Sequence, residues 1–207
     1  MARLVLVLGR SGSGKSASMR NFAPGDVAII NVLGKELPFK SEHKTFVSDD
    51  YAKIKQALTS APKDVIVIDD AGYLMTNEFM NRCYEKGYEK FTEMARNFYE
   101  LLRFVKFSLP DNKIVYFFMH IDTDAEGYER PMTAGKMLDE KYNIAGVVTI
   151  ALKSEKHDNK YVFKTTGNNQ EITKTPMGMF ADEEIDNDLA AVTQAIKKYY
   201  NITEATK

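Results

Sequence analysis

Cysteine and histidine are scarce in this sequence. Its 207 residues include one cysteine, Cys83, and three histidines. A single cysteine cannot form a disulfide within the chain, and so few Cys and His side chains almost exclude a zinc site of the Cys/His type. A chain of this length can bury a sufficient apolar core, so it needs neither disulfides nor a structural metal in order to fold.

Long hydrophobic runs are also missing. The longest, such as Ile114–Met119, are far shorter than the roughly 20 residues that span a bilayer. Met1–Leu8 is apolar, but it leads into a Gly/Ser loop with a lysine, without a basic leader or a small-residue cleavage site. We therefore expect a soluble, cytoplasmic protein with no membrane partner.

The sequence also has no excess of positive or negative charge. The chain has 28 Lys and Arg against 29 Asp and Glu, a net charge of −1. A domain that binds nucleic acid by itself usually has a clear basic excess. Strong DNA binding by one isolated copy is therefore not expected, whereas a weak or assembly-dependent contact stays open.

The apolar segments that are present predict an α/β fold. Five short runs are rich in β-branched residues and nearly continuous, which is typical of parallel strands buried on both faces. These runs are Leu4–Leu8, Val27–Val32, Val65–Ile68, Ile114–Met119 and Val147–Leu152. Two weaker, alternating segments, Lys44–Ser48 and Lys160–Lys164, are expected to form edge strands.

Helical periodicity occurs between and after these runs. From Met80 to Val105, apolar or small residues recur at spacings of three and four, which predicts one long helix, or two joined near Gly87. A second pattern follows the acidic segment 182–184 and predicts a C-terminal helix over about residues 183–201. We therefore predict one domain over residues 1–207, with its core in about residues 3–180. Its expected architecture is three-layered, with helices on both faces of a mainly parallel sheet.

The most specific motif follows the first strand. Gly9, Arg10, Ser11, Gly12, Ser13, Gly14, Lys15 and Ser16 match G-x-x-x-x-G-K-[ST] at every fixed position. Glycines let the backbone N–H groups surround phosphate oxygens, and a helix starting at about Lys15 would direct its positive end at the anion. Lys15 would contact the β- and γ-phosphates and Ser16 would ligate Mg²⁺. A flexible Gly/Ser turn is the alternative, but the preceding strand favours a site for a nucleoside triphosphate.

Two carboxylates end the third strand. Asp69 and Asp70 follow Val65–Ile68, as in the Walker B strand of phosphate-loop proteins, whose first Asp holds Mg²⁺ through water. Asp70 would then take the place of an acidic base that orients the attacking water. Without the phosphate loop, a solvated acidic turn would be the simpler interpretation.

Strand order adds a further expectation. An extra strand between the phosphate-loop strand and the Walker B strand separates the ATPase and recombinase division from kinases and GTPases. Two segments lie between the two motifs, Val27–Val32 and the weaker Lys44–Ser48. The next strand, Ile114–Met119, ends in His120, which would face the γ-phosphate and report hydrolysis. The alternative is a surface histidine at a strand end.

Taken together, these residues resemble a family: the small RecA-like ATPases of bacteriophages, grouped with single-strand annealing and recombination proteins. The resemblance covers about residues 3–180. Besides the phosphate loop and residues 67–70, it includes the segments Asn31–Phe39, Phe117–His120, Thr133–Leu138 and Lys174–Phe180.

The resemblance implies a RecA-type core that binds ATP and Mg²⁺ between protomers of a homo-oligomer and acts on single-stranded DNA in phage recombination, in the host cytoplasm. It also implies that Lys174 could contact the γ-phosphate of a neighbouring protomer. By charge alone, Arg130 and Lys136 are further candidates for such a trans-acting cation, and ordinary solvated side chains are the alternative.

A DNA surface and two other functions remain to be weighed. Lysines 153, 156, 160, 164 and 174, with Tyr161 and Phe163 between them, fit a single-stranded DNA surface or, equally, an exposed hairpin. The tyrosines at 84, 88 and 99 are expected to pack within helices, with base-stacking platforms as the alternative. The alternative functions are a nucleoside or nucleotide kinase, disfavoured by only seven scattered arginines, and a nucleotide-switched binding module with little turnover.

Overall fold

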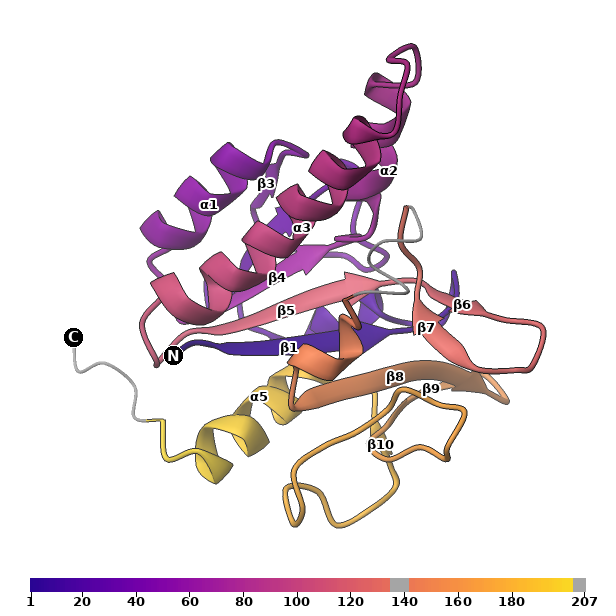
Figure 1. The fold of residues 1–207 in the computed structure, drawn as a ribbon. Coiled ribbons are helices and arrows are strands. Elements are labelled where there is room, and N and C mark those ends of the chain that lie inside the picture. The colour runs from indigo at the N-terminus through magenta and orange to yellow at the C-terminus, as the bar shows by residue number, and fades with distance from the viewer. Residues whose placement is uncertain (135–141, 203–207) are drawn as a thin grey trace.

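The computed structural model describes residues 1–134 and 142–202 and has an α/β fold with an eight-stranded sheet (Figure 1). The strands of this sheet are β1 Arg3–Leu8, β2 Ala28–Asn31, β3 Thr45–Val47, β4 Val65–Asp69, β5 Ile114–Met119, β8 Ile150–His157, β9 Lys160–Lys164 and β10 Glu184–Asp186. Their order is β10-β9-β8-β1-β5-β4-β2-β3. The six strands from β8 to β3 are parallel, and β9 and β10 add an antiparallel extension.

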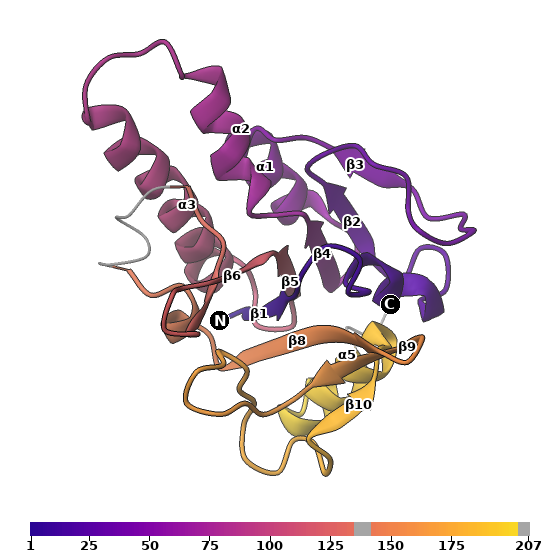
Figure 2. The same ribbon diagram turned by 90° about the vertical axis from the view of Figure 1, so that its right-hand side faces the viewer.

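Helices cover both faces of this sheet. Helices α1 Tyr51–Ser60, α2 Tyr73–Asn81 and α3 Glu89–Ser108 lie on one side, and α5 Leu189–Tyr199 lies on the other (Figures 1 and 2). Strand β1 shows the two-sided burial: Leu4, Leu6 and Leu8 pack in the core beneath α1 and α3, whereas Val5 and Val7 pack in the core with α5. The near-continuous apolar strands of the sequence follow from this arrangement, because a strand covered on both faces has no polar side.

Most predicted strands are confirmed, with three corrections. Val147–Leu152 was expected as a strand, but residues 145–147 form a 3₁₀ turn and β8 begins at Ile150. Lys160–Lys164 is a strand but not an edge, because β10 pairs with it on its outer side. The strand between β1 and β4 in the sheet is β5, and not the segment Val27–Val32, which lies beyond β4 as β2.

One helix prediction is confirmed in its two-helix form, and two others change. The pattern from Met80 divides into α2 and α3, and the connecting turn contains Gly87 at φ 95°, a conformation that favours glycine. The C-terminal helix starts six residues later than expected, because residues 184–186 pair with β9 and the Asp188 carboxylate then caps α5 by accepting from the N–H groups of Ala190 and Ala191. The segment after the phosphate loop is a short 3₁₀ helix, Ser16–Asn21, and Pro24 disfavours its continuation beyond Phe22.

Two elements were not anticipated. Helix α1 has only two fully buried residues, Ile54 and Leu58, so its apolar pattern is weak, and Asp50 marks its start by accepting from the N–H groups of Ala52 and Lys53. A small hairpin of β6 Ile121–Thr123 and β7 Glu129–Pro131 follows β5.

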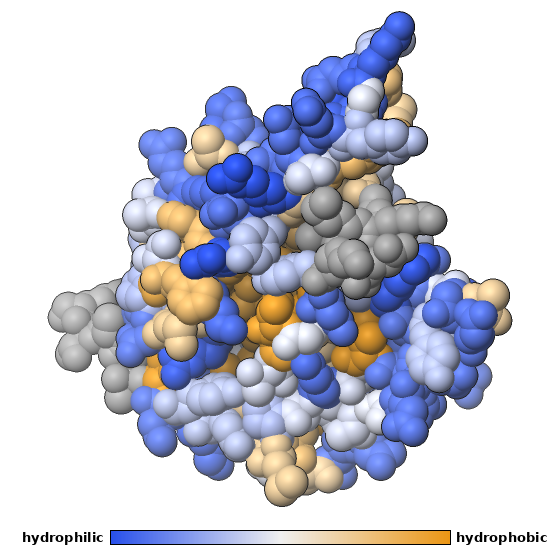
Figure 3. Space-filling view, viewed as in Figure 1, coloured by the Kyte–Doolittle hydropathy of each residue, from blue (hydrophilic) through white to orange (hydrophobic). Residues whose placement is uncertain are grey.

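The paired helices α2 and α3 project from the body at their connected ends. Figure 3 shows this projection as mostly hydrophilic on the face drawn. Among residues 1–134 and 142–202, no helix has the length and apolar character needed to cross a membrane.

Candidate nucleotide site

The site lies at the carboxyl ends of three neighbouring parallel strands. Strand β5 pairs with β1 on one side and with β4 on the other, and the three strands end at the same edge of the sheet. The chain therefore brings the loop after β1, the carboxylates after β4 and His120 after β5 to one place. Ligands of open α/β sheets bind at this edge.

The loop at residues 9–16 has a backbone that requires glycine. Gly12 and Gly14 have φ angles of 74° and 100°, which L side chains rarely adopt. Gly9 has no room for a side chain, because a Cβ atom there would lie 2.4 Å from Ser13 Oγ and 2.5 Å from the carbonyl oxygen of Ser154. The glycines of the motif thus hold a tight loop in this structure.

Neighbouring strands hold the loop from outside. The hydroxyl of Ser154 on β8 donates to the carbonyl oxygen of Ser13 at 2.8 Å, and Asn187 Nδ2 donates to the same hydroxyl at 3.1 Å. The Tyr161 ring covers Gly14, where a Cβ would lie 2.6 Å from the ring. Sequence reasoning missed these supports, since nothing in the local pattern connects residues more than 130 positions away to the loop.

Lys15 is buried inside the loop. Its Nζ donates to the carbonyl oxygens of Gly9 at 2.8 Å and Arg10 at 3.0 Å. Burial lowers the Lys15 pKa to about 8, although the carboxylates of Asp70 and Asp69 oppose the change. The lysine is therefore still largely protonated at neutral pH and can bind an anion.

Ser16 and Asp69 meet across the site. Ser16 Oγ donates to Asp69 Oδ1 at 2.9 Å, which joins the phosphate loop to the end of β4. Burial, reinforced by the charge of Asp70, raises the Asp69 pKa to about 6 despite the bond from Ser16. A hydroxyl and a carboxylate at hydrogen-bond distance are the hard oxygen donors that Mg²⁺ prefers, so the two residues fit the predicted metal role.

Asp70 lies next to this pair and has a different environment. Its φ is 60°, in the left-handed region, which a non-glycine residue seldom occupies outside turns and functional sites. Lys35 Nζ lies 2.6 Å from Asp70 Oδ2, and His120 Nε2 lies 3.6 Å from Asp70 Oδ1. Burial alone would raise the Asp70 pKa, but the interactions with His120 and Lys35 outweigh it and lower the pKa. Asp70 is therefore ionised at neutral pH, and its carboxylate can accept hydrogen bonds.

His120 is directed into the site. Its ring contacts Tyr73 edge-on, with the centroids 5.8 Å apart, and its side chain is 18% exposed. The strand end thus places His120 beside Asp70 and away from open surface, which favours the predicted site role over a simple surface histidine.

A cleft of about 230 Å³ connects these groups. Its lining includes residues 11–17 of the loop and its continuation, the two carboxylates, His120 and Tyr161, together with Lys35, Glu36 and Pro38 from the segment after β2. The volume is below the roughly 300–1,000 Å³ of pockets that enclose a whole small ligand, so the cleft suits the phosphate end of a nucleotide. Ser13 Oγ is buried against Gly9 and has no hydrogen-bond partner in the described part of the chain.

Two of the three trans-acting candidates, Arg130 and Lys174, do not line this cleft. Arg130 on β7 pairs with Asp122 at 2.6 Å, and Lys174 forms a backbone bridge with Ala151. Such positions are compatible with action on a neighbouring protomer but do not by themselves indicate it. Lys136 lies outside the described residues.

Carboxylates neutralise several of the lysines in the β8–β9 hairpin, so this hairpin has less unpaired positive charge than its composition indicates. Lys153 pairs with three glutamates, Lys164 pairs with Glu171, and Lys160 pairs with Asp186. Phe163 is completely buried in the core with α5, so the expectation that it stacks on bases is wrong. The neutralised lysines disfavour the DNA-surface interpretation, and the hairpin is not fully exposed either, because β8 lies between β9 and β1 in the sheet and Val162 and Phe163 are buried.

The tyrosine expectation is wrong at two positions. Tyr84 and Tyr88 lie in the turn between α2 and α3 and are 95% and 88% exposed, because the helical periodicity is interrupted there. Tyr99 does pack on α3, with its ring 4.8 Å from that of Tyr142 in an edge-on contact.

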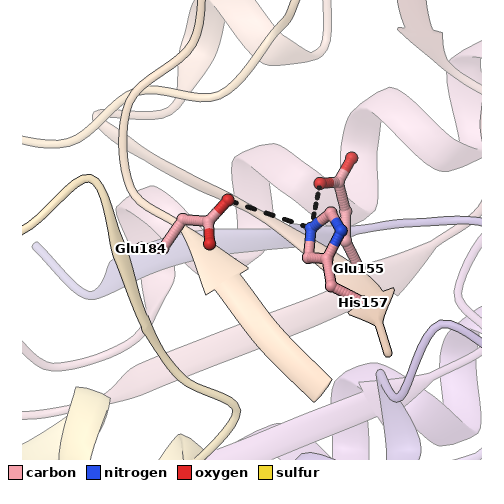
Figure 4. Close-up of side chains that lie close together, drawn as sticks. All are labelled: Glu155, His157 and Glu184. Carbon is pink, nitrogen blue, oxygen red and sulfur yellow. Dashed lines mark hydrogen bonds and ion pairs between the residues drawn. The ribbon is translucent and has the colours of Figure 1, made fainter. Parts of the chain in front are cut away.

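A cluster of Glu155, His157 and Glu184 lies at the far end of the β8–β10 extension (Figure 4). His157 Nε2 is 3.2 Å from Glu155 and 3.8 Å from Glu184. Glu155 also pairs with Lys153 at 2.8 Å, and that ammonium would repel a divalent cation. The interactions drawn are therefore explained as surface ion pairs.

A scan against protein-family models and a search of curated proteins found no match to this chain. Its functional interpretation thus rests on the sequence motifs and on the geometry above.

Proposed function

We propose that this chain is a phosphate-loop ATPase of the RecA-like division that binds ATP with Mg²⁺ and hydrolyses it. The observation that carries the proposal is the 2.9 Å bond between Ser16 and Asp69. It joins the two motifs that the sequence predicts to share one metal ion. The position of β5 between β1 and β4 supports the ATPase division over the kinase division.

Each residue of the cleft has a defined task in this proposal. Lys15 and the N–H groups of the loop bind the phosphate chain, and Ser16 and Asp69 hold Mg²⁺. When bound, this ion supplies positive charge that offsets the charge on the phosphates. Asp70 accepts a proton from the attacking water through its carboxylate, and His120 orients that carboxylate from 3.6 Å. Tyr73, in edge contact with the His120 ring, limits the positions that the ring can take.

The biological setting is carried by the family resemblance. We propose that the chain acts on single-stranded DNA in phage recombination or annealing, as a homo-oligomer with ATP at protomer interfaces. The ion-paired hairpin of β8 and β9 is not a favourable DNA surface, because Lys153, Lys160 and Lys164 already have carboxylate partners. Assembly would have to create the DNA-binding surface from several copies, which agrees with the net charge of −1.

One experiment separates this function from its alternatives. ATP turnover is measured alone, with single-stranded DNA, and with a panel of nucleoside and nucleotide acceptors. Phosphate release that DNA stimulates supports the proposed function. Phosphate transfer to an acceptor would instead identify a kinase, and nucleotide binding without turnover would identify a switched binding module.

A further inference from the structure

The segment after β2 holds the backbone of Lys35, one of its residues that line the cleft, in a fixed position. Asn31, 3% exposed at the end of β2, donates from Nδ2 to the carbonyl oxygen of Lys35 at 2.6 Å. Gly34 makes the turn between them at φ 66°. Asn31 itself pairs in the sheet with Asp69. The backbone of Lys35 is therefore tied to the strand next to the predicted metal residue.

The side chain of Lys35 is far less constrained than its backbone. It is 58% exposed, whereas the Asp70 side chain with which it pairs at 2.6 Å is 9% exposed. Its ammonium also lies 5.7 Å from the centroid of the Tyr73 ring. Of the described residues that line the cleft, Lys15 and Lys35 are the two lysines, and they approach it from different elements. Lys15 belongs to the loop after β1 and is buried, whereas Lys35 belongs to the segment after β2 and is largely exposed.

On the basis of the proposed function, we propose that Lys35 is a second phosphate-binding lysine, which contacts the terminal phosphate and makes the site prefer ATP to ADP. Asp70 must lie beside the terminal phosphate to act on the attacking water. A cation in contact with the Asp70 carboxylate therefore lies beside that phosphate as well.

The ion pair with Asp70 is compatible with an exchange of partners. The Lys35 side chain is 58% exposed and has a flexible four-carbon stem, so its ammonium can leave one carboxylate oxygen of Asp70 for a more highly charged phosphate oxygen. The exchange would free Asp70 Oδ2 for the water, while His120 continues to orient the carboxylate. ADP lacks the terminal phosphate and would leave Lys35 on Asp70.

Equilibrium binding tests this inference without relying on turnover. The dissociation constants of a non-hydrolysable ATP analogue and of ADP are measured with Mg²⁺ for the wild type, Lys35→Met and Lys35→Gln. Lys40→Met is the matched control, because Lys40 is an exposed lysine of the same segment outside the cleft lining. Loss of one charged hydrogen bond should weaken the analogue about 10- to 100-fold in both Lys35 variants and change ADP binding less than about twofold. The control should bind both nucleotides as the wild type does.

The outcomes are distinguishable. An unchanged ratio of ATP-analogue to ADP affinity in Lys35→Met and Lys35→Gln, whether both affinities fall equally or neither changes, would overturn the role of Lys35 while leaving the proposed function intact. A wild-type protein that binds neither nucleotide would overturn both proposals. Lys35→Arg should retain part of the preference for the ATP analogue, since it keeps the positive charge.

Discussion

The buried carboxylate of Asp69 should make the site a source of instability, and Asp69→Asn should therefore stabilise the protein. The pKa of Asp69 is raised from 3.8 to about 6, mainly by burial. At 1.36 kcal/mol per pKa unit, ionising Asp69 in the folded protein costs about 3 kcal/mol at pH 8. Asparagine has nearly the same shape and its side-chain oxygen can still accept from Ser16, so this cost is removed while the contact is kept.

The sign of the pH dependence follows from linkage. A group whose pKa is higher in the folded state contributes stability below its unfolded pKa, and that contribution is lost as the pH rises through its folded pKa. The advantage of Asp69→Asn should therefore be absent near pH 4, grow between about pH 4 and 6, and be complete above pH 7.

Urea unfolding without Mg²⁺ or nucleotide, at pH 5 and pH 8, measures this difference. We expect a gain of about 3 kcal/mol at pH 8, which corresponds to a rise in Tm of about 6–12 °C for a chain of this size. Asp26→Asn, at an exposed position, is the control and should change little. Equal stability of Asp69→Asn and the wild type at pH 8 would refute the reasoning. Mg²⁺ with nucleotide should stabilise the wild type but not the variant, because a ligand stabilises only the state that binds it.

Three further results are expected. Lys15→Ala should lower ATP turnover by about 10²-fold or more with the fold intact by circular dichroism, and wild-type turnover in this variant would contradict the phosphate-loop assignment. His120→Ala should keep nucleotide affinity but lose about 10²-fold in hydrolysis, because Asp70 is no longer oriented; unchanged rates with and without DNA would return His120 to a surface role. Affinity for Mg²⁺ and nucleotide, titrated by fluorescence from pH 5 to 9, should be highest between about pH 6 and 8. Below this window Asp69 gains a proton, and above it Lys15 loses one; a flat profile would contradict both pKa changes.

Local sequence was enough to predict most strands of the large sheet and to select the motif residues. A near-continuous apolar run such as Ile114–Met119 is recognisable because a strand covered on both faces must be apolar on both sides, and it agrees with β5 at both ends. The glycines and lysine of the phosphate loop are recognisable because their chemistry depends on backbone conformation and on neighbours within eight residues. The division of the long helical pattern near Gly87 has the same local origin.

Element boundaries and pairings were less accessible, since long-range contacts decide them. Residues 184–186 were expected in a helix because acidic residues favour a helix start, but pairing with β9 made them a strand. Phe163 looked like a stacking platform because aromatic and basic residues alternate around it, and only the sheet shows that its ring points into the core.

The site, too, has features that the sequence predicts and features that only the tertiary structure decides. The sequence alone selected the candidate residues: Lys15, Ser16, Asp69 and Asp70 were predicted from motif spacing, and His120 from its place at a strand end. Tertiary structure alone decided that Lys35 meets Asp70, that Tyr161 and Ser154 support the loop, and that three strand ends converge on one cleft. The physical reason is that spacing along the chain records local backbone geometry, whereas the burial and charge that tune the site come from residues brought together by the order of strands in the sheet.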